Sequence, residues 1–252
     1  MTALVTGASS GIGRDIAREL CRKGIKVIIS GRDKKSLYAL KKELGRENVK
    51  AVIIADLSCK KECFKLYEQV KPYNIDILIN NAGFGTFGEF TKTDLDTELD
   101  MISVNVTAVH ILTKLFLRDF TAKNRGYILN VASVAAFLAG PLMATYYATK
   151  NYVLRLTQAV HEEIRRKNSR VYIGAFCPGP VTSNFDQRAG IKHSTKFLSS
   201  KDAAKSAVTN MFLRKPIIVP SLMINVLSHI IRAVPDCIIT PIAYVFETRK
   251  KG

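Results

Sequence analysis

Short apolar runs rich in β-branched residues alternate with longer amphipathic stretches along most of this chain. This alternation constrains the fold more than any other feature, because parallel strands joined by crossover helices need both faces of their sheet covered. The runs expected to form strands are Ala3–Thr6, Val27–Ser30, Val49–Ala55, Ile75–Asn80, Tyr127–Ala132 and Val171–Cys177. The pattern predicts an α/β fold with a doubly wound parallel sheet flanked by helices.

Nothing in the sequence divides the chain into separate units. Its 252 residues suffice for one large domain, and we find neither an internal repeat nor a low-complexity linker. We expect a single domain over residues 1–252, in which about 184–252 form a substrate loop and an apolar carboxyl-terminal segment. Prolines such as Pro220 and Pro235 interrupt that segment, which argues against a membrane-spanning helix. We favour a cover for the substrate pocket or a subunit contact over peripheral contact with a membrane.

Charge and cysteine content exclude several classes of function. The chain carries 38 basic and 21 acidic side chains, but the basic residues are scattered without a nucleic-acid-reading motif, so we do not expect nucleic-acid binding. The five cysteines form no C-x-x-C pair and the four histidines stand far apart, which argues against disulfides and a metal site. The amino terminus lacks a secretion signal, so we expect a cytoplasmic protein with reduced thiols.

A glycine-rich turn directly follows the first expected strand. It reads Thr-Gly-Ala-Ser-Ser-Gly-Ile-Gly, and its glycines let the backbone turn sharply and approach a pyrophosphate at the start of a helix. This position between a strand and a helix predicts a dinucleotide site. The expected contacts in the turn are Gly7, Ser9, Ser10, Gly11, Ile12 and Gly13.

The end of the second strand bears on which dinucleotide binds. An NAD site usually has an acidic residue there to hold the ribose hydroxyls. This chain instead has Gly31 followed by Arg32, which can pair with a 2′-phosphate. We therefore predict NADP(H) over NAD(H). Asp33 leaves an alternative open, because a slip of two residues would bring its carboxylate close to the ribose.

Tyr146 and Lys150 lie four residues apart in a stretch, residues 144–166, that reads as a helix, so they share one face. A nearby ammonium lowers the pKa of a phenol from about 10 toward neutral pH, where proton transfer becomes effective. Ser133 precedes Tyr146 by thirteen residues, and its hydroxyl can hold a substrate oxygen beside the phenol. Tyr147 also comes within reach of Lys150.

Taken in order, these motifs resemble the short-chain dehydrogenase/reductase family, tightly over residues 1 to about 183 and more loosely beyond. The G-x-x-x-G-x-G turn, the Asn-Asn-Ala-Gly segment that ends at Gly83, and the Tyr-x-x-x-Lys motif carry the resemblance. It implies a Rossmann-like fold and reversible NADP(H)-dependent transfer of a hydride to or from a carbonyl or secondary alcohol. It also implies a homodimer or homotetramer that pairs through helices near residues 95–120 and 144–166. Of Tyr146 and Tyr147, the family resemblance implies Tyr146, which alone has the Tyr-x-x-x-Lys and serine spacings of that family.

The same resemblance assigns further site residues. Asn105 would complete a catalytic set with Ser133, Tyr146 and Lys150, by anchoring a water that relays protons to the lysine. Strand ends and the segment after the sixth strand would surround the adenine and the nicotinamide. The cofactor contacts implied there are Asp56, Leu57, Asn81, Ala82, Gly83, Pro178, Gly179, Val181 and Thr182, together with Tyr146 and Lys150.

Apolar residues cluster where a substrate would lie, which favours an apolar ketone or alcohol such as a steroid or a lipid-derived carbonyl. They are Phe84, Phe137, Leu138, Leu142, Met143 and Phe185. Core packing explains several of them equally well. Two other classes stay open. A non-catalytic NADP(H)-sensing protein need not keep serine, tyrosine and lysine, and a nucleotide-sugar epimerase or dehydratase commonly has a larger substrate domain.

Overall fold

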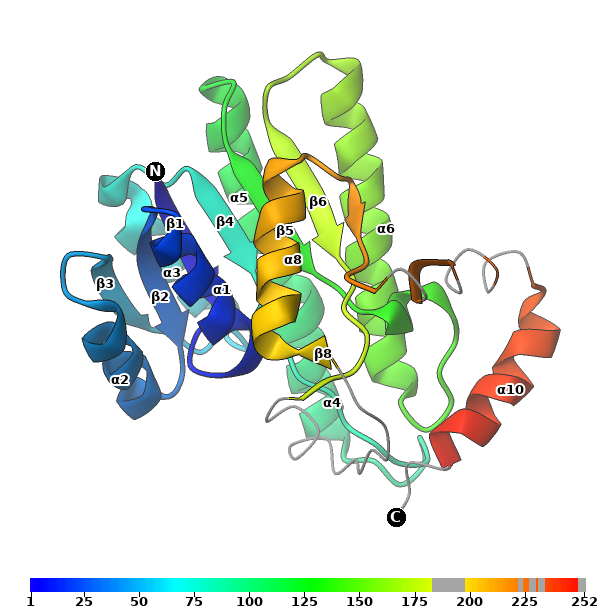
Figure 1. The fold of residues 1–252 in the computed structure, drawn as a ribbon. Helices are drawn as coiled ribbons and strands as arrows, with labels where there is room; N and C mark the ends of the chain where they lie inside the picture. Colours follow the sequence, from blue (N-terminus) through cyan, green and yellow to red (C-terminus); the bar gives the residue numbers. More distant parts are fainter. Residues whose placement is uncertain (183–197, 222–223, 227–229, 231–233, 249–252) are drawn as a thin grey trace.

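A computed structural model of the chain describes residues 1–182, 198–221, 224–226, 230 and 234–248 (Figure 1). The strands are β1 (Thr2–Thr6), β2 (Lys26–Gly31), β3 (Val49–Ile54), β4 (Ile77–Asn80), β5 (Tyr127–Val131), β6 (Tyr172–Phe176), β7 (Val181–Thr182), β8 (Leu198–Ser199) and β9 (Ile217–Ile218). The helices are α1 (Gly11–Arg22), α2 (Lys34–Leu44), α3 (Lys60–Val70), η1 (Lys71–Tyr73), α4 (Leu95–Ile102), η2 (Ser103–Ala108), α5 (Val109–Ala122), η3 (Val134–Phe137), α6 (Ala144–Arg166), α8 (Ser200–Phe212) and α10 (Asp236–Thr248).

Seven of the strands form one parallel sheet in the order β3-β2-β1-β4-β5-β6-β9. The order reverses at β1, which pairs with β2 on one side and β4 on the other, as expected of a doubly wound sheet. The predicted fold class is therefore confirmed. The prediction missed β9, whose two residues pair with the end of β6, because so short a strand gives no periodic signal.

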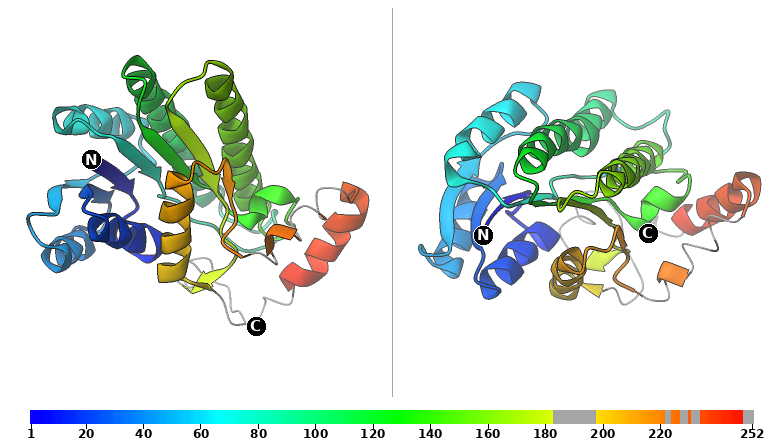
Figure 2. Two further views of the ribbon diagram at one scale, coloured as in Figure 1. Left: turned by 45° about the horizontal axis from the view of Figure 1, so that its top comes forward. Right: turned by 90° about the horizontal axis from the view of Figure 1, so that it is seen from above.

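Helices cover both faces of this sheet, as the view from above shows in Figure 2. One layer contains α1, α2 and α8, and buries residues such as Ile16, Leu37 and Val208 against the strands. The other contains α3, α5 and α6, and buries Leu66 and Phe116. The central strands β1, β4 and β6 are buried along their whole length for this reason, whereas the edge strand β3 is partly exposed.

A buried network of polar side chains fixes the middle of the sheet. The Asn80 side-chain amide donates to Asn130 Oδ1 (2.9 Å) and to Thr113 Oγ1 (3.0 Å), and Asn130 Nδ2 donates to Thr157 Oγ1 (2.9 Å). These residues come from β4, β5, α5 and α6. Because buried amides are costly without partners, the network holds the ends of two central strands and two helices in one arrangement.

The helix predicted near residues 95–120 is not regular. Its α-helical parts, α4 and α5, are joined by η2, a π-helical segment over Ser103–Ala108. The whole stretch, Leu95–Ala122, is long and apolar enough to cross a membrane by length and composition alone. It packs on the sheet through residues such as Phe116 and Phe120, which are nearly fully buried.

The final helix, α10, projects from one side of the molecule (Figure 1). Ile238, Val245 and Phe246 are more than half exposed on it. We expected the carboxyl-terminal segment to cover the substrate pocket or to form a subunit contact. None of the described residues of α10 lines the main cavity, although the helix touches its rim, as shown below. The predicted substrate loop falls largely within residues 183–197, outside the described residues.

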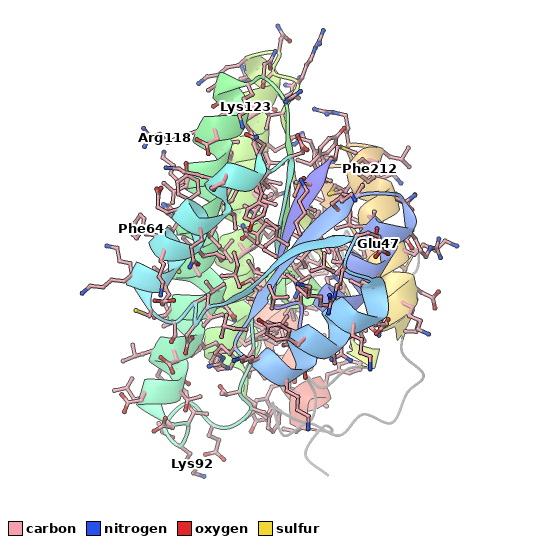
Figure 3. All side chains as sticks on the ribbon, turned by 90° about the vertical axis from the view of Figure 1, so that its left-hand side faces the viewer. Glu47, Phe64, Lys92, Arg118, Lys123 and Phe212 are labelled. Atoms are coloured by element: carbon pink, nitrogen blue, oxygen red, sulfur yellow. The ribbon has the colours of Figure 1, made fainter. Side chains whose placement is uncertain are left out.

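Basic side chains are spread over the surface. Figure 3 shows Arg118 and Lys123 near one end of the molecule and Lys92 near the other. The five cysteines are free thiols. Within the described ranges, no cluster of three or more His, Cys, Asp or Glu side chains is placed to hold a metal ion.

Candidate active site

A cavity of about 350 Å³ opens at the carboxyl ends of the central strands, where β1 and β4 lie side by side. In a doubly wound sheet, ligands bind in the crevice at this point of reversal. The predicted site residues that line the cavity are Gly7, Ser9, Ser10, Gly11, Ile12, Arg32, Asp56, Leu57, Asn81, Ala82, Gly83, Ser133, Tyr146, Lys150, Pro178, Gly179 and Val181.

Three predicted site residues are not part of this lining. Gly13 is buried beneath the glycine turn, and Asn105 is fully buried. The side chain of Thr182 lies outside the described residues, as does the whole of Phe185. Gly13 and Asn105 therefore act on the cavity through the residues they touch.

The glycine turn needs its glycines for two different reasons. Gly7 and Gly11 have positive φ angles, 64° and 53°, which residues with a side chain rarely adopt. Gly13 is required by space instead, because a Cβ atom there would lie 2.5 Å from the carbonyl oxygen of Gly7 and would overlap the amide of Asn81. The turn is thus packed directly against the end of β4.

Hydrogen bonds fasten β4 to the glycine turn. Thr6 Oγ1 accepts from the backbone N–H groups of Asn81 (3.0 Å) and Ala82 (3.1 Å). Asn81 Nδ2 donates to the carbonyl oxygens of Thr6 (3.0 Å) and Gly7 (3.2 Å). These four bonds explain why the Asn-Asn-Ala-Gly segment lies beside the turn in space, although more than 70 residues separate the two in sequence.

The amino end of α1 faces this turn. Ser10 is its N-cap residue, and its side chain makes no capping hydrogen bond, so the first backbone N–H groups of α1 have no partner from that side chain. A glycine cradle beside an uncapped helix start fits the pyrophosphate of a dinucleotide, because the N–H groups and the helix dipole both favour negative charge.

The end of β2 and the residues that follow it form the next part of the cavity wall. The carboxylate in this segment, that of Asp33, makes hydrogen bonds to a neighbouring residue. Asp33 is the N-cap residue of α2: its Oδ1 accepts from the backbone N–H of Ser36 (3.0 Å) and its Oδ2 from the Ser36 hydroxyl (2.5 Å). Gly31 contributes no side chain, and a Cβ atom there would lie 3.6 Å from Ser9 Oγ. Arg32 is 60% exposed, with its Nη1 3.9 Å from Asp56 Oδ2.

Tyr146 and Lys150 both line the other end of the cavity, from the first turns of α6. The Lys150 ammonium donates to the carbonyl oxygen of Val131 (3.0 Å) and lies 5.8 Å from the centre of the Tyr146 ring. Burial lowers the pKa of Lys150 to about 8, because desolvation disfavours its charged form. The lysine therefore still carries its charge at neutral pH.

Asn105 lies in the π-helical segment and contacts the residues around the lysine. Its Oδ1 accepts from the backbone N–H of Phe84 (3.1 Å), and its Nδ2 donates to the Phe84 carbonyl (2.9 Å) and to Thr149 Oγ1 (3.1 Å). A Cβ atom on Gly83 would lie 2.8 Å from Asn105 Oδ1 and 3.3 Å from Lys150 Nζ. Asn105 Oδ1 and Lys150 Nζ therefore both lie next to Gly83, where the absence of a side chain leaves space for them. π-Segments are often found at functional sites.

Ser133 follows β5 and begins the short helix η3. Its Oγ accepts from the backbone N–H of Ala135 (3.1 Å), which orients the hydroxyl, and the residue lines the same cavity as Tyr146. This bond does not use the hydroxyl proton, so the hydroxyl can donate a hydrogen bond to an oxygen in the cavity.

The apolar wall near Tyr146 differs in part from the prediction. Phe84 and Met143 line the cavity as expected. Phe137 and Leu138 instead pack with Val153 and Leu154 of α6, so the alternative of core packing applies to them. Leu142 does not line the cavity and has a positive φ of 64°.

Tyr147 lines the cavity as well, a role that the sequence analysis missed. Its hydroxyl donates to Glu247 Oε1 of α10 (2.6 Å). No local pattern could have indicated this contact, because the two residues are 100 positions apart.

Comparisons with known proteins agree with this geometry. The model of the short chain dehydrogenase family matches residues 1–194. An uncharacterized oxidoreductase of Staphylococcus saprophyticus is 33% identical over 215 residues, which cover 82% of this chain and 88% of the relative.

Two solved structures bind different cofactors. A short-chain dehydrogenase from Sphingobium yanoikuyae in complex with NADPH superimposes with a TM-score of 0.84, 29% identity and 92% coverage of both chains. A short-chain dehydrogenase/reductase from Burkholderia phymatum in complex with NAD has a TM-score of 0.82 and 22% identity, covers 90% and 91% of the two chains, and shows the fold alone. Similar folds hold either nucleotide, so the choice depends on side chains.

Proposed function

The chain belongs to the short-chain dehydrogenase family, and from that premise we propose that it is an NADP(H)-dependent oxidoreductase that interconverts a carbonyl and a secondary alcohol on an apolar substrate. The observation that carries the proposal is the meeting of Ser133, Tyr146 and Lys150 in the cavity that also contains the glycine turn. One cavity therefore offers both a nucleotide cradle and an acid–base group.

The bound nicotinamide supplies the hydride donor or acceptor, and the chain supplies the proton. In reduction, the Tyr146 hydroxyl gives its proton to the substrate oxygen as negative charge develops there. The Ser133 hydroxyl donates a hydrogen bond to the same oxygen and stabilises that charge. In the alcohol oxidation the two groups act in reverse.

Lys150 supports Tyr146 in two ways. Its buried ammonium favours negative charge on the phenol oxygen after the proton has left. The hydrogen bond from this ammonium to the carbonyl oxygen of Val131, at the end of β5, fixes the position of the positive charge. Asn105 holds the backbone at Phe84 and the side chain of Thr149, so we assign it a positioning role beside the lysine.

The preference for NADP(H) rests on the end of β2. Asp33 also lines the cavity, but both of its carboxylate oxygens accept hydrogen bonds from Ser36, which hold the side chain at the start of α2. Gly31 leaves space next to Ser9, and Arg32 offers an exposed guanidinium that suits phosphate.

An apolar substrate fits the wall around Tyr146. Met101, Ala135 and Met143 form a cluster with this tyrosine, and Phe84, Phe87 and Tyr147 pack against it. Such a surface favours a ketone or alcohol with aromatic or aliphatic substituents.

A homo-oligomer is part of the same proposal. Leu95, Leu99 and Ile102 of α4 and Tyr152 of α6 are exposed, on two of the helices that the family resemblance assigns to subunit pairing. Exposed apolar residues of this kind are typical of contacts between subunits. Sedimentation of the purified protein measures the assembly.

The decisive experiment compares Tyr146→Phe with Tyr147→Phe. NADPH absorbance is followed with a panel of ketones, aldehydes and nucleotide sugars. We expect Tyr146→Phe to lose turnover by at least about 10³-fold while NADPH still binds, because the proton donor alone is removed. Tyr147→Phe should keep its turnover number. If Tyr147→Phe were the inactive variant, the assignment of the proton donor would be wrong. Tight NADPH binding without activity on any substrate would favour a sensor.

A further inference from the structure

Glu247 is one of two buried residues of α10, and unlike the other, Ala243, it carries a charged side chain. Tyr244, Val245 and Phe246, the three residues before it, are 49%, 51% and 63% exposed, whereas Glu247 is 3% exposed. A helix that turns apolar side chains to the outside and a carboxylate to the inside reverses the usual arrangement. Because burial of a carboxylate is costly, a specific partner must hold it there.

One such partner is Tyr147, the residue next to the proposed proton donor. Its hydroxyl donates to Glu247 Oε1 over 2.6 Å, a length typical of a hydrogen bond to a charged acceptor. Burial and the neighbouring Glu247 carboxylate raise the pKa of Tyr147 well above its usual value. The phenol therefore keeps its proton and stays a donor at neutral pH.

The Tyr147 ring is closely packed as well as hydrogen-bonded. A Cβ atom on Gly140 would overlap the ring, so that glycine lets the loop before α6 lie flat against it. The ring centre lies 6.1 Å from that of Tyr146, in an edge-to-face arrangement. Tyr147 also packs against the apolar cluster that contains Met143 and lines the cavity. One side chain thus joins the cavity wall to the last helix.

We propose that Glu247 is a positioning residue for substrate recognition: by holding the Tyr147 hydroxyl, the carboxyl-terminal helix fixes the aromatic wall against which the apolar part of the substrate binds. The inference rests on the proposed function, because it assigns this wall to the carbonyl substrate. The cofactor end lies across the cavity, at the glycine turn and Arg32, and involves neither residue.

Removal of the carboxylate leaves the Tyr147 hydroxyl without this acceptor, so we expect the ring to shift from its packed position toward substrate space. We expect Glu247→Ala to raise KM for a bulky aromatic ketone about tenfold, with kcat and the Kd for NADPH within twofold of the wild type. Tyr147→Phe should raise KM to a similar extent, since it removes the other half of the same bond. The double variant should show no further rise, because the two changes break one interaction.

Two further variants separate positioning from stability. Glu247→Gln keeps an acceptor for the Tyr147 hydroxyl and should bring KM back to within about threefold of the wild type. Glu98 is a matched control: it is 8% exposed, and its Oε1 accepts from Thr93 Oγ1 (2.7 Å), but it does not line the cavity. Glu98→Ala should lower Tm and leave KM unchanged.

Several results would overturn the proposal. An unchanged KM in both Glu247→Ala and Tyr147→Phe would mean that the bond serves stability alone. Additive KM effects in the double variant would mean that the two residues act separately. These failures leave the proposed function intact, because wild-type turnover continues. If the wild-type protein reduces no carbonyl with NADPH, the proposed function fails and this inference fails with it.

Discussion

The two ends of the cavity are built in different ways. At the cofactor end, backbone atoms and glycines form the surface, and hydrogen bonds from Thr6 and Asn81 tie it to neighbouring strands of the sheet. At the substrate end, the wall is made of side chains, and one bond from Tyr147 links it to a helix whose outer face is exposed. The first end tolerates little change, whereas the second can vary without disturbing the sheet.

The largest effect on stability should come from the cofactor end. We expect Gly13→Ala to reduce the free energy of unfolding by about 3 kcal/mol, because the added methyl group forces Asn81 and the Gly7 carbonyl apart. Thermal unfolding measures the loss. Gly24→Ala is the control: Gly24 has a φ of 73° but open space around it, so only about 1 kcal/mol of backbone strain should appear. Equal losses would show that the turn is not tightly packed.

The next effect is the pH dependence that comes from Lys150. In the unfolded chain this lysine keeps its proton up to about pH 10.5, whereas in the folded protein it loses the proton near pH 8. The unfolded state therefore binds more protons at this site between these values, so Lys150 should contribute a rise in stability of about 1.4 kcal/mol per pH unit there. Burial raises the pKa of the Cys21 and Cys63 thiols to about 11, which opposes this rise above about pH 9, so the contribution of Lys150 is the difference between the wild type and Lys150→Met. Denaturant unfolding from pH 7 to 10 measures this rise. Lys150→Met should remove it, and Lys61→Met, at an exposed position, should not.

A smaller effect concerns cofactor choice. Arg32→Ala should weaken NADPH binding about tenfold, equivalent to about 1.4 kcal/mol, and leave NADH binding nearly unchanged, because only NADPH has the phosphate. Titration of cofactor fluorescence gives both constants. Lys42→Ala, at the far end of α2, controls for general loss of positive charge. Equal weakening of both cofactors would refute the preference for NADP(H).

The smallest effect is expected on α10. Ile242 is 45% exposed, so Ile242→Ser should change the free energy of unfolding by less than about 0.5 kcal/mol. The same change at Ile128, which is fully buried, should cost about 3 kcal/mol or more. A loss near 2 kcal/mol at Ile242 would contradict the comparison, since it would mean that another copy of the chain covers α10 in solution.

The same contrast explains what could be predicted from the sequence. The cofactor end depends on local requirements, such as positive φ at Gly7 and Gly11, and these leave a readable pattern of glycines. Tyr146 and Lys150 were found because one helical turn connects them. The parallel sheet followed from the alternation of strands and helices, apart from the two residues of β9.

What escaped prediction depends on distant contacts or on subtle backbone changes. The bond between Tyr147 and Glu247 joins residues 100 positions apart. Asp33 caps α2 by accepting hydrogen bonds from Ser36, and only the folded structure shows that both carboxylate oxygens are used. Phe137 points into the core because η3 turns it there, which apolar character alone does not reveal.

The π-helical segment around Asn105 has a consequence for how this chain tolerates length changes. In a π-helical turn, hydrogen bonds join backbone groups five residues apart instead of four, so the turn accommodates one extra residue. Deletion of one residue between Ser103 and Ala108 would let the segment close into a regular helix, with α4 and α5 on either side keeping nearly the same relative orientation and the wide turn around Asn105 lost. Asn105 would then turn away from Phe84, so a single-codon deletion here would misalign the site while the helix itself survived.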